Sequence, residues 1–190
     1  LPHLTNKRII YRTPLRYKLD SKEVLGDPCG MTGTKLEVKL LFVTCLEQHL
    51  DDIIRTIEEL GIEVDEVVPS SIAAGQVALN KKQRSVGCAL VNIGAETVSI
   101  AVFENDIPIS LQVLPIGSTD ITNDIALGLK IPLEEAEKIK MSGPAGTYPK
   151  KKLDEIIEAR LEDIFRTHRR AFEKDRAKRT TSRGSNLDRR

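Results

Sequence analysis

The feature that most constrains the fold is a pair of apolar runs within residues 87–103, joined by a short turn. Both runs contain small and β-branched apolar residues, and Asn92–Thr97, with the sequence Asn-Ile-Gly-Ala-Glu-Thr, lies between them. Such runs predict buried strands, and Gly94–Thr97 predict the tight turn that joins them. Small residues let a backbone or a ligand come close, and amides that point the same way bind anions such as phosphate. An ordinary β-hairpin without a ligand is the alternative, which the turn alone favours.

The composition indicates a globular chain with a substantial core. Of its 190 residues 40% are hydrophobic, which fits one sizeable domain or two small ones. Aromatic residues are scarce and tryptophan is absent, which argues against a stacking surface for single-stranded nucleic acid. No apolar run approaches the roughly 20 residues of a membrane span. The first residues contain neither a signal-peptide segment nor an initiator Met, so we expect the chain to begin inside a longer gene product.

Cysteines and histidines form no recognisable metal or redox motif. Cys29, Cys45 and Cys88 are widely spaced, and the last two lie in apolar runs, as small core residues do. A reducing cytoplasm is the simplest compartment for such a chain. The histidines are also far apart, and we predict surface or capping positions for all of them: His3, His49 and His168.

Apolar periodicity predicts the order of strands and helices. Strands are predicted at 7–19 (broken at Pro14), 36–45, 63–68 and 107–115. Helices are predicted at 47–60, 72–79 (capped by Ser70 or Ser71), 119–129, 133–141 and 152–165. A polar loop is predicted at 80–84. This order indicates a small strand–strand–helix unit, 1–64, and a larger α/β unit, 65–165, in which three hairpin-linked strands precede helices.

The C-terminal residues 166–190 differ in charge from the rest of the chain. They carry a net charge of +7, against −6 for the preceding residues, although the whole chain has only +1. Three interpretations stay open for this basic tail. It is disordered or a fraying helix extension, because it has few apolar residues; it is a basic arm attracted to anionic lipid or nucleic acid; or it is the aberrant product of a truncated or frame-shifted gene.

Residues 1–165 resemble FtsA, the actin-like bacterial cell-division family that tethers the FtsZ ring to the membrane. Four segments carry the resemblance, in order: Gly30–Glu37 (Gly-Met-Thr-Gly-Thr-Lys-Leu-Glu), Asn92–Thr97, Ile121–Ala126 and Ala136–Lys140. The second is similar to the family's second phosphate-binding loop. A glycine turn alone is a weak signal, whereas the ordered set is specific.

The resemblance implies an α/β fold. Residues 65–165 are expected to form an actin-like (ribonuclease H-like) ATPase subdomain, 2A, with an antiparallel strand meander and helices. Residues 1–64 are expected to be part of a small α+β module of the SHS2 type, called 1C, and 166–190 the basic tail. The family's first phosphate hairpin, most of subdomain 2B, the adenosine loop and the C-terminal amphipathic membrane helix have no counterpart here. Half of a nucleotide cleft is therefore expected.

The resemblance also assigns candidate residues for binding a nucleotide. Phosphate is expected to contact Asn92, Gly94, Ala95, Glu96, Thr97 and Gly117. Ribose is expected to contact Glu137 and Lys140, for which a solvated ion pair on a helix is the alternative. ATP and Mg²⁺ are the cofactors implied for the intact family protein, with weak or no binding by this chain. No catalytic residue and no metal ligand is predicted.

Three departures from the family's pattern argue against hydrolysis. The family's phosphate hairpin begins with Asp, which orients magnesium waters, whereas the uncharged Asn92 stands here. Glu96 brings a negative charge to the turn, which is unfavourable for phosphate unless its side chain points outward. Relatives with ATPase activity carry Glu-Pro where this chain has Ser70 and Ser71, so the carboxylate that positions the attacking water is absent.

The resemblance implies a divisome assembly protein rather than an enzyme. Its expected partners are FtsZ and other division proteins, further copies of itself in filaments, and the membrane through a helix missing here; no nucleic acid is expected. Its expected location is the cytoplasmic face of the inner membrane. The strand edge at Arg16–Lys18 or Lys35–Lys39 is a candidate contact. The alternatives are an active actin-fold ATPase and a PilM-like pilus assembly protein of the same fold.

Overall fold

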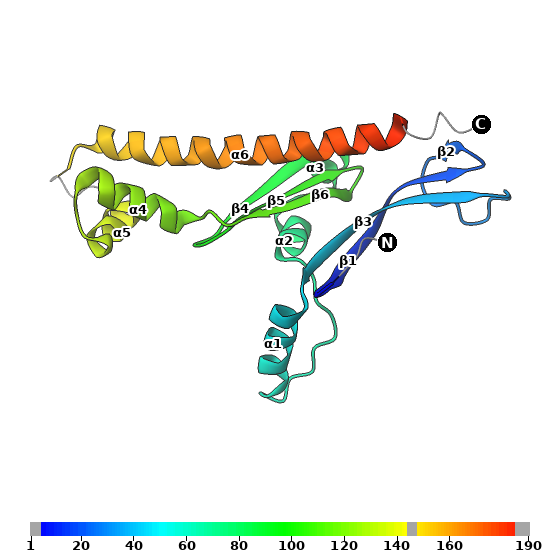
Figure 1. Cartoon of the computed structure of the whole chain (residues 1–190), viewed down its shortest axis with the longest axis horizontal. Coiled ribbons are helices and arrows are strands. Elements are labelled where there is room, and N and C mark those ends of the chain that lie inside the picture. Colours follow the sequence, from blue (N-terminus) through cyan, green and yellow to red (C-terminus); the bar gives the residue numbers. More distant parts are fainter. Residues whose placement is uncertain (1–4, 144–147, 185–190) are drawn as a thin grey trace. The chain divides into compact units, whose positions relative to one another are not determined.

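The computed structural model describes residues 5–143 and 148–184, apart from the side chains of 171 and 174–184 (Figure 1). The described residues form two three-stranded sheets and six helices. Two compact units share the chain: one comprises 1–90 and 101–111, and the other comprises 91–100 and 112–190. The boundary between them crosses the second sheet. The division into 1–64, 65–165 and 166–190 stays a prediction.

The first sheet is an antiparallel ribbon in the order β2-β1-β3. Its strands are β1 (Lys7–Leu19), β2 (Lys22–Val24) and β3 (Leu36–Leu46). The predicted break at Pro14 is wrong, because β1 continues through a bulge between Pro14 and Arg16, where a missing N–H is tolerated. Asp20 and Ser21, with φ angles of 48° and 69°, make the two-residue turn into β2, which the sequence did not predict.

The order of this sheet decides between the two predicted strand edges. Tyr17–Leu19 pairs with β2 on one side and β3 on the other, so the Arg16–Lys18 segment lies in the central strand. β3 has one strand neighbour among the described residues, so Lys35–Lys39 borders an open edge.

Helix α1 (Glu47–Glu58) follows β3, as predicted, but the strand predicted at 63–68 is wrong. The segment is described and has no regular secondary structure. A strand needs a hydrogen-bonded neighbour, and none of the described strands pairs with this segment.

Two short helices precede the second sheet, and the loop predicted at 80–84 is wrong. Helix α2 (Ser70–Ala78) begins after Pro69 without a side-chain cap, so the predicted serine cap is also wrong. Helix α3 (Lys81–Val86) starts with a capping box, in which Asn80 and Gln83 each accept from the other's backbone N–H at 2.9 Å.

The second sheet confirms the predicted strand–turn–strand. Its strands are β4 (Cys88–Ile93), β5 (Val98–Glu104) and β6 (Ile107–Leu114), in the order β4-β5-β6. Asn105 and Asp106, with φ angles of 53° and 64°, form the two-residue turn between β5 and β6. Val98 and Phe103 are fully buried, as the apolar run predicted. Consecutive hairpin-linked strands therefore lie where the sequence places them.

Three helices follow and share one hydrophobic core: α4 (Ser118–Leu129), α5 (Leu133–Ser142) and α6 (Lys150–Gly184) (Figure 1). The fully enclosed part of this core consists of Ile121, Ile125, Ala136, Ile139 and Leu153. A Cβ at Gly128 would lie 2.5 Å from Ile156 Cδ1, which shows how closely α4 and α6 pack. Asp124 and Arg160 join the same two helices through two charge-assisted hydrogen bonds of 2.5 and 2.8 Å.

Helix α6 continues beyond Phe165, where the sequence pattern predicted its end. Residues 166–184 are helical rather than disordered, which matches the helix-extension alternative; 185–190 lie outside the described residues. His168 is 4% exposed, so its predicted surface position is wrong. It follows the buried Ile164 by four residues and therefore shares its helix face. Among the described residues, no helix is both long and apolar enough to cross a membrane.

Candidate functional site

The turn between β4 and β5 has backbone donors without an acceptor among the described residues. Gly94 N–H closes the turn by donating to the carbonyl of Thr97 at 2.8 Å. Within the described part of the chain, the amides of Ala95 and Glu96 donate to no acceptor, and both residues are exposed. Exposed amides on successive residues of a turn form a concave site for anions. The turn can therefore accept a phosphate oxygen, and the Thr97 hydroxyl lies beside it as a further donor.

The N-terminus of α4 holds this turn in place. Ser118 N–H donates to Gly94 O at 2.8 Å, and Thr119 N–H donates to Ala95 O at 3.0 Å. A Cβ on Gly117 would lie 2.0 Å from Ala95 O, so only glycine allows this approach. The φ angle of Gly117 is −147°, which any residue adopts. Close packing against the turn, rather than backbone conformation, therefore requires glycine at this position.

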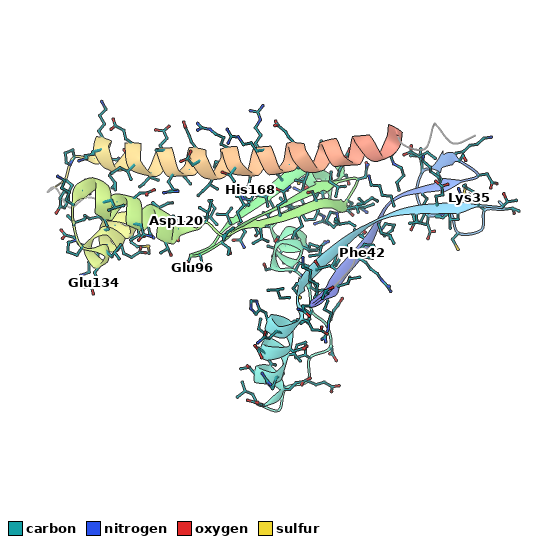
Figure 2. The ribbon with its side chains drawn as sticks, viewed as in Figure 1. Lys35, Phe42, Glu96, Asp120, Glu134 and His168 are labelled. Atoms are coloured by element: carbon teal, nitrogen blue, oxygen red, sulfur yellow. The ribbon has the colours of Figure 1, made fainter. Side chains whose placement is uncertain are left out.

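Two carboxylates lie at the same junction (Figure 2). Glu96 Oε1 accepts a hydrogen bond from Thr119 Oγ1 at 2.9 Å. Asp120 Oδ2 accepts one from Gly117 N–H at 2.8 Å. The Glu96 side chain is therefore tied to the first turn of α4 in this structure. Its negative charge still lies close to the turn, and it opposes the binding of a strongly anionic ligand.

Glu137 and Lys140 form a hydrogen-bonded cluster with α4. Lys140 Nζ lies 2.6 Å from Glu137 Oε2 and donates to Thr122 Oγ1 at 2.8 Å, while Thr122 Oγ1 donates to Glu137 Oε2 at 2.5 Å. The hydrogen bond from Lys140, followed by the one from Thr122, lowers the pKa of Glu137. The Lys140 side chain is 15% exposed and that of Glu137 is 48% exposed. The pair is thus fixed by packing on one side and open to a ligand on the other.

The peptide of Ser118 connects the two groups of predicted residues. Its N–H binds Gly94 O in the turn, and its carbonyl accepts from Lys140 Nζ at 3.3 Å. The turn, Gly117, Glu137 and Lys140 therefore belong to one continuous network within one compact unit. Asn92 is exposed at the end of β4, and no described side-chain hydrogen bond ties it to the turn.

Three further residues of the network were not predicted from the sequence: Ser118, Thr119 and Thr122. Ser118 and Thr122 are four residues apart on α4 and therefore share a face, a spacing visible in the sequence. Which face meets α5 depends on tertiary packing, so that contact could not be predicted. Ser70 and Ser71 occupy the first turn of α2, where Ser71 is buried and Ser70 exposed.

A family model described as cell division protein FtsA matches residues 89–187 of the chain. The chain belongs to the FtsA family. A second model, the SHS2 domain inserted in FtsA, matches residues 2–44, which include β1, β2 and most of β3. The cell division protein FtsA of Bacillus subtilis (strain 168) is 35% identical over 83% of this chain and 36% of that protein. The chain thus spans about a third of the length of this relative.

Solved structures with low sequence identity confirm the actin-like fold. A chain of the PilM-PilN type IV pilus biogenesis complex superposes with a TM-score of 0.65 over 93% of this chain and 48% of its own length, at 18% identity. MreB 5 of Spiroplasma citri, in a structure bound to AMPPNP, gives a TM-score of 0.56 over 68% of this chain and 48% of its own, at 14% identity. The likeness to these proteins shows a shared fold alone. The predicted fold class, an actin-like α/β fold with an SHS2 module, is confirmed.

Proposed function

We propose that this chain is the part of an FtsA-type cell-division protein that holds the phosphates and ribose of a nucleotide, and that it hydrolyses the nucleotide weakly or not at all. The observation that carries the proposal is the network through Ser118, which links the β4–β5 turn to the Lys140–Glu137 pair. In bound ATP with Mg²⁺, the groups to be recognised would be the negatively charged phosphates and the two hydroxyl groups of the ribose.

The residues present fit such a ligand in part. The free amides of Ala95 and Glu96 suit phosphate oxygens. Glu137, whose lowered pKa keeps it ionised, can accept hydrogen bonds from ribose hydroxyls. The Glu96 carboxylate works in the opposite direction. Affinity in the millimolar range is therefore expected for this chain, whereas an intact cleft with both phosphate hairpins would bind more tightly.

Titration of the complete chain with ATP and Mg²⁺, followed by amide NMR, tests the nucleotide site. Amide shifts centred on Ala95, Glu96 and Ser118 are expected, and Lys140→Met should abolish saturation of these shifts. Lys138→Met is the matched control, because Lys138 lies on the same helix, α5, and is exposed. Micromolar affinity measured by calorimetry would contradict the half-cleft argument, and shifts spread evenly over the chain would contradict the site.

Weak hydrolysis is proposed because the positions that resemble the family's catalytic ones lack carboxylates. Ser70 and Ser71 stand where relatives with ATPase activity carry Glu-Pro, and Asn92 stands in place of Asp. A phosphate-release assay separates this proposal from the active-ATPase alternative. Release no faster than spontaneous ATP hydrolysis is expected, and steady turnover well above that rate would contradict the proposal.

Membership of the FtsA family supports a role in division as an assembly protein. We propose FtsZ, other division proteins and further copies of the chain as partners, at the cytoplasmic face of the inner membrane. Co-sedimentation with polymerised FtsZ is the direct measurement, made with the longest protein that contains this chain. Absence of the protein from the FtsZ pellet, in the presence and absence of nucleotide, would remove FtsZ from its partners.

A further inference from the structure

Two hydrogen-bond donors share the same pair of acceptors beside the proposed ribose contact. Lys140 Nζ lies 2.6 Å from Glu137 Oε2, and the Thr122 hydroxyl donates to the same oxygen at 2.5 Å. Both donors also reach the Ser118 carbonyl oxygen, but at the longer distance of 3.3 Å each. Short hydrogen bonds to a charged acceptor are stronger than long ones to a neutral carbonyl. In this structure the Glu137 carboxylate therefore draws both donors away from Ser118.

The hydroxyl of Thr122 can serve only one of these two acceptors at a time. A threonine hydroxyl carries one proton and two lone pairs. One lone pair accepts from Lys140 Nζ at 2.8 Å, so the single proton goes either to Glu137 or to Ser118. Thr122 is 6% exposed, and a buried hydroxyl left without an acceptor is costly. A weaker bond to Glu137 must therefore turn the Thr122 proton toward the Ser118 carbonyl.

The Ser118 carbonyl begins a chain of two peptide groups that ends at the β4–β5 turn. The planar peptide that carries this carbonyl also carries the Thr119 N–H, which donates to Ala95 O at 3.0 Å. The next peptide carries Ala95 O and the Glu96 N–H, which donates to no acceptor within the described part of the chain. Hydrogen bonds in such a chain polarise one another. A stronger bond at the Ser118 carbonyl therefore makes the Glu96 N–H a better donor.

We propose that Thr122 is a positioning residue that couples the ribose contact of a nucleotide to its phosphate contact. When ribose hydroxyls donate to Glu137, the carboxylate attracts its two other donors less strongly. The Thr122 proton and Lys140 Nζ then turn to the Ser118 carbonyl, and the Glu96 N–H donates more strongly to phosphate. The inference rests on the proposed function and adds cooperativity between the two halves of the ligand, which is reciprocal by thermodynamic necessity.

Two nucleotides that differ only in their ribose hydroxyls test the coupling. The complete chain is titrated with ATP and with dideoxy-ATP, which lacks both hydroxyls, each with Mg²⁺. The amide proton shifts of Thr119 and Glu96 are then extrapolated to saturation. Both protons should lie further downfield with ATP, because their hydrogen bonds are stronger in that complex. This comparison needs no substitution, so it stays decisive whatever the stability of a variant.

Substitution of Thr122 tests its own part in the coupling. Thr122→Val keeps the shape of the side chain but removes the hydroxyl, so the saturated shifts with the two nucleotides should coincide. The ratio of the two affinities should also fall about 5-fold, the lower end of usual coupling. Thr122→Ser retains the hydroxyl and should preserve both the shift difference and the affinity ratio.

The control and the contrary outcomes separate this inference from the proposed function. Thr56→Val is the matched control, because the Thr56 hydroxyl donates to the carbonyl of Asp52, four residues before it, at 2.7 Å on α1. It should leave the difference between the nucleotides unchanged. Equal saturated shifts in the unchanged chain, or a difference that Thr122→Val keeps, would overturn this inference alone. No shift at the turn with either nucleotide would overturn the proposed nucleotide site as well.

Discussion

The contact between Gly117 and the β4–β5 turn gives the sharpest test of the site, through the substitution Gly117→Ala. An added Cβ would lie 2.0 Å from Ala95 O and 2.4 Å from Ala95 C, and Cβ atoms essentially never approach closer than 3.0 Å. The turn must therefore move by about 1 Å or more. Such a shift lengthens the Ser118–Gly94 and Thr119–Ala95 hydrogen bonds, now 2.8 and 3.0 Å, beyond bonding distance.

The magnitude follows from these two bonds. Each contributes about 0.5–1.5 kcal/mol net, so Gly117→Ala should lower the free energy of unfolding by ~1–3 kcal/mol, the usual range for overpacking. Urea unfolding measures the loss, and hydrogen exchange should show faster exchange at Ser118 and Thr119. Thr119→Ala is the matched control: it removes the hydroxyl bonded to Glu96 without adding an atom and should change stability by no more than ~0.5 kcal/mol. If Gly117→Ala matches the unchanged chain in urea and retains slow exchange at both amides, the close-approach argument is wrong.

Three further predictions concern charge and burial. Asp20 accepts hydrogen bonds from the Thr34 hydroxyl and from the backbone N–H groups of Lys35 and Thr34, which lower its pKa below 3.8. Its stabilising contribution is therefore present above that pH and is lost in more acid solution. In Asp20→Asn the urea midpoint should depend less on pH between about pH 5 and pH 2. Arg160→Met, which leaves Asp124 partly buried without its partner, should cost ~1–3 kcal/mol in urea unfolding, against ~0.5 kcal/mol or less for the exposed Arg169→Met. Burial lowers the pKa of His168 below 6.5, so the free energy of unfolding should be highest above that pH and should fall as the pH drops from about 7 to 5. His168→Leu should remove this pH dependence. If the variant keeps the pH profile of the unchanged chain, the ring is not buried in solution.

Local patterns in the sequence predicted most of the elements. The apolar runs around Asn92–Thr97 became β4 and β5, and the helical periodicities became α1, α2, α4 and α5. These predictions are correct because the spacing of apolar side chains and the choice of turn residues depend only on short stretches of sequence. Pro14 misled the prediction because its missing N–H falls at a bulge, which depends on the partner strand. The spacing of Asn80 and Gln83 fits a capping box, but the polar segment that follows has no apolar face and therefore predicts a loop, whereas it forms the helix α3.

The errors at the end of the chain and within the site have a common origin in tertiary contacts. His168 continues the apolar stripe of α6, but a lone histidine gives no sign in sequence of being buried. The resemblance supplied Glu137 and Lys140 as a pair, whereas their attachment to Thr122 and to the Ser118 carbonyl became visible only once α4 and α5 were packed together. The resemblance supplied the candidate residues, whose role in binding stays a prediction, but it did not supply the hydrogen bonds that connect them.

That connection determines how the site can recognise an anion. A helix N-terminus commonly binds phosphate through its free amides. In α4, the amides of Ser118 and Thr119 are already used to hold the turn, and Asp120 accepts from Gly117 N–H. Helix α4 therefore serves as a clamp, and the donors left for a ligand are those of the turn itself. Because Ser118 N–H holds the turn and the Ser118 carbonyl accepts from Lys140 Nζ, we expect a change in the Lys140–Glu137 pair to alter the position of the turn amides.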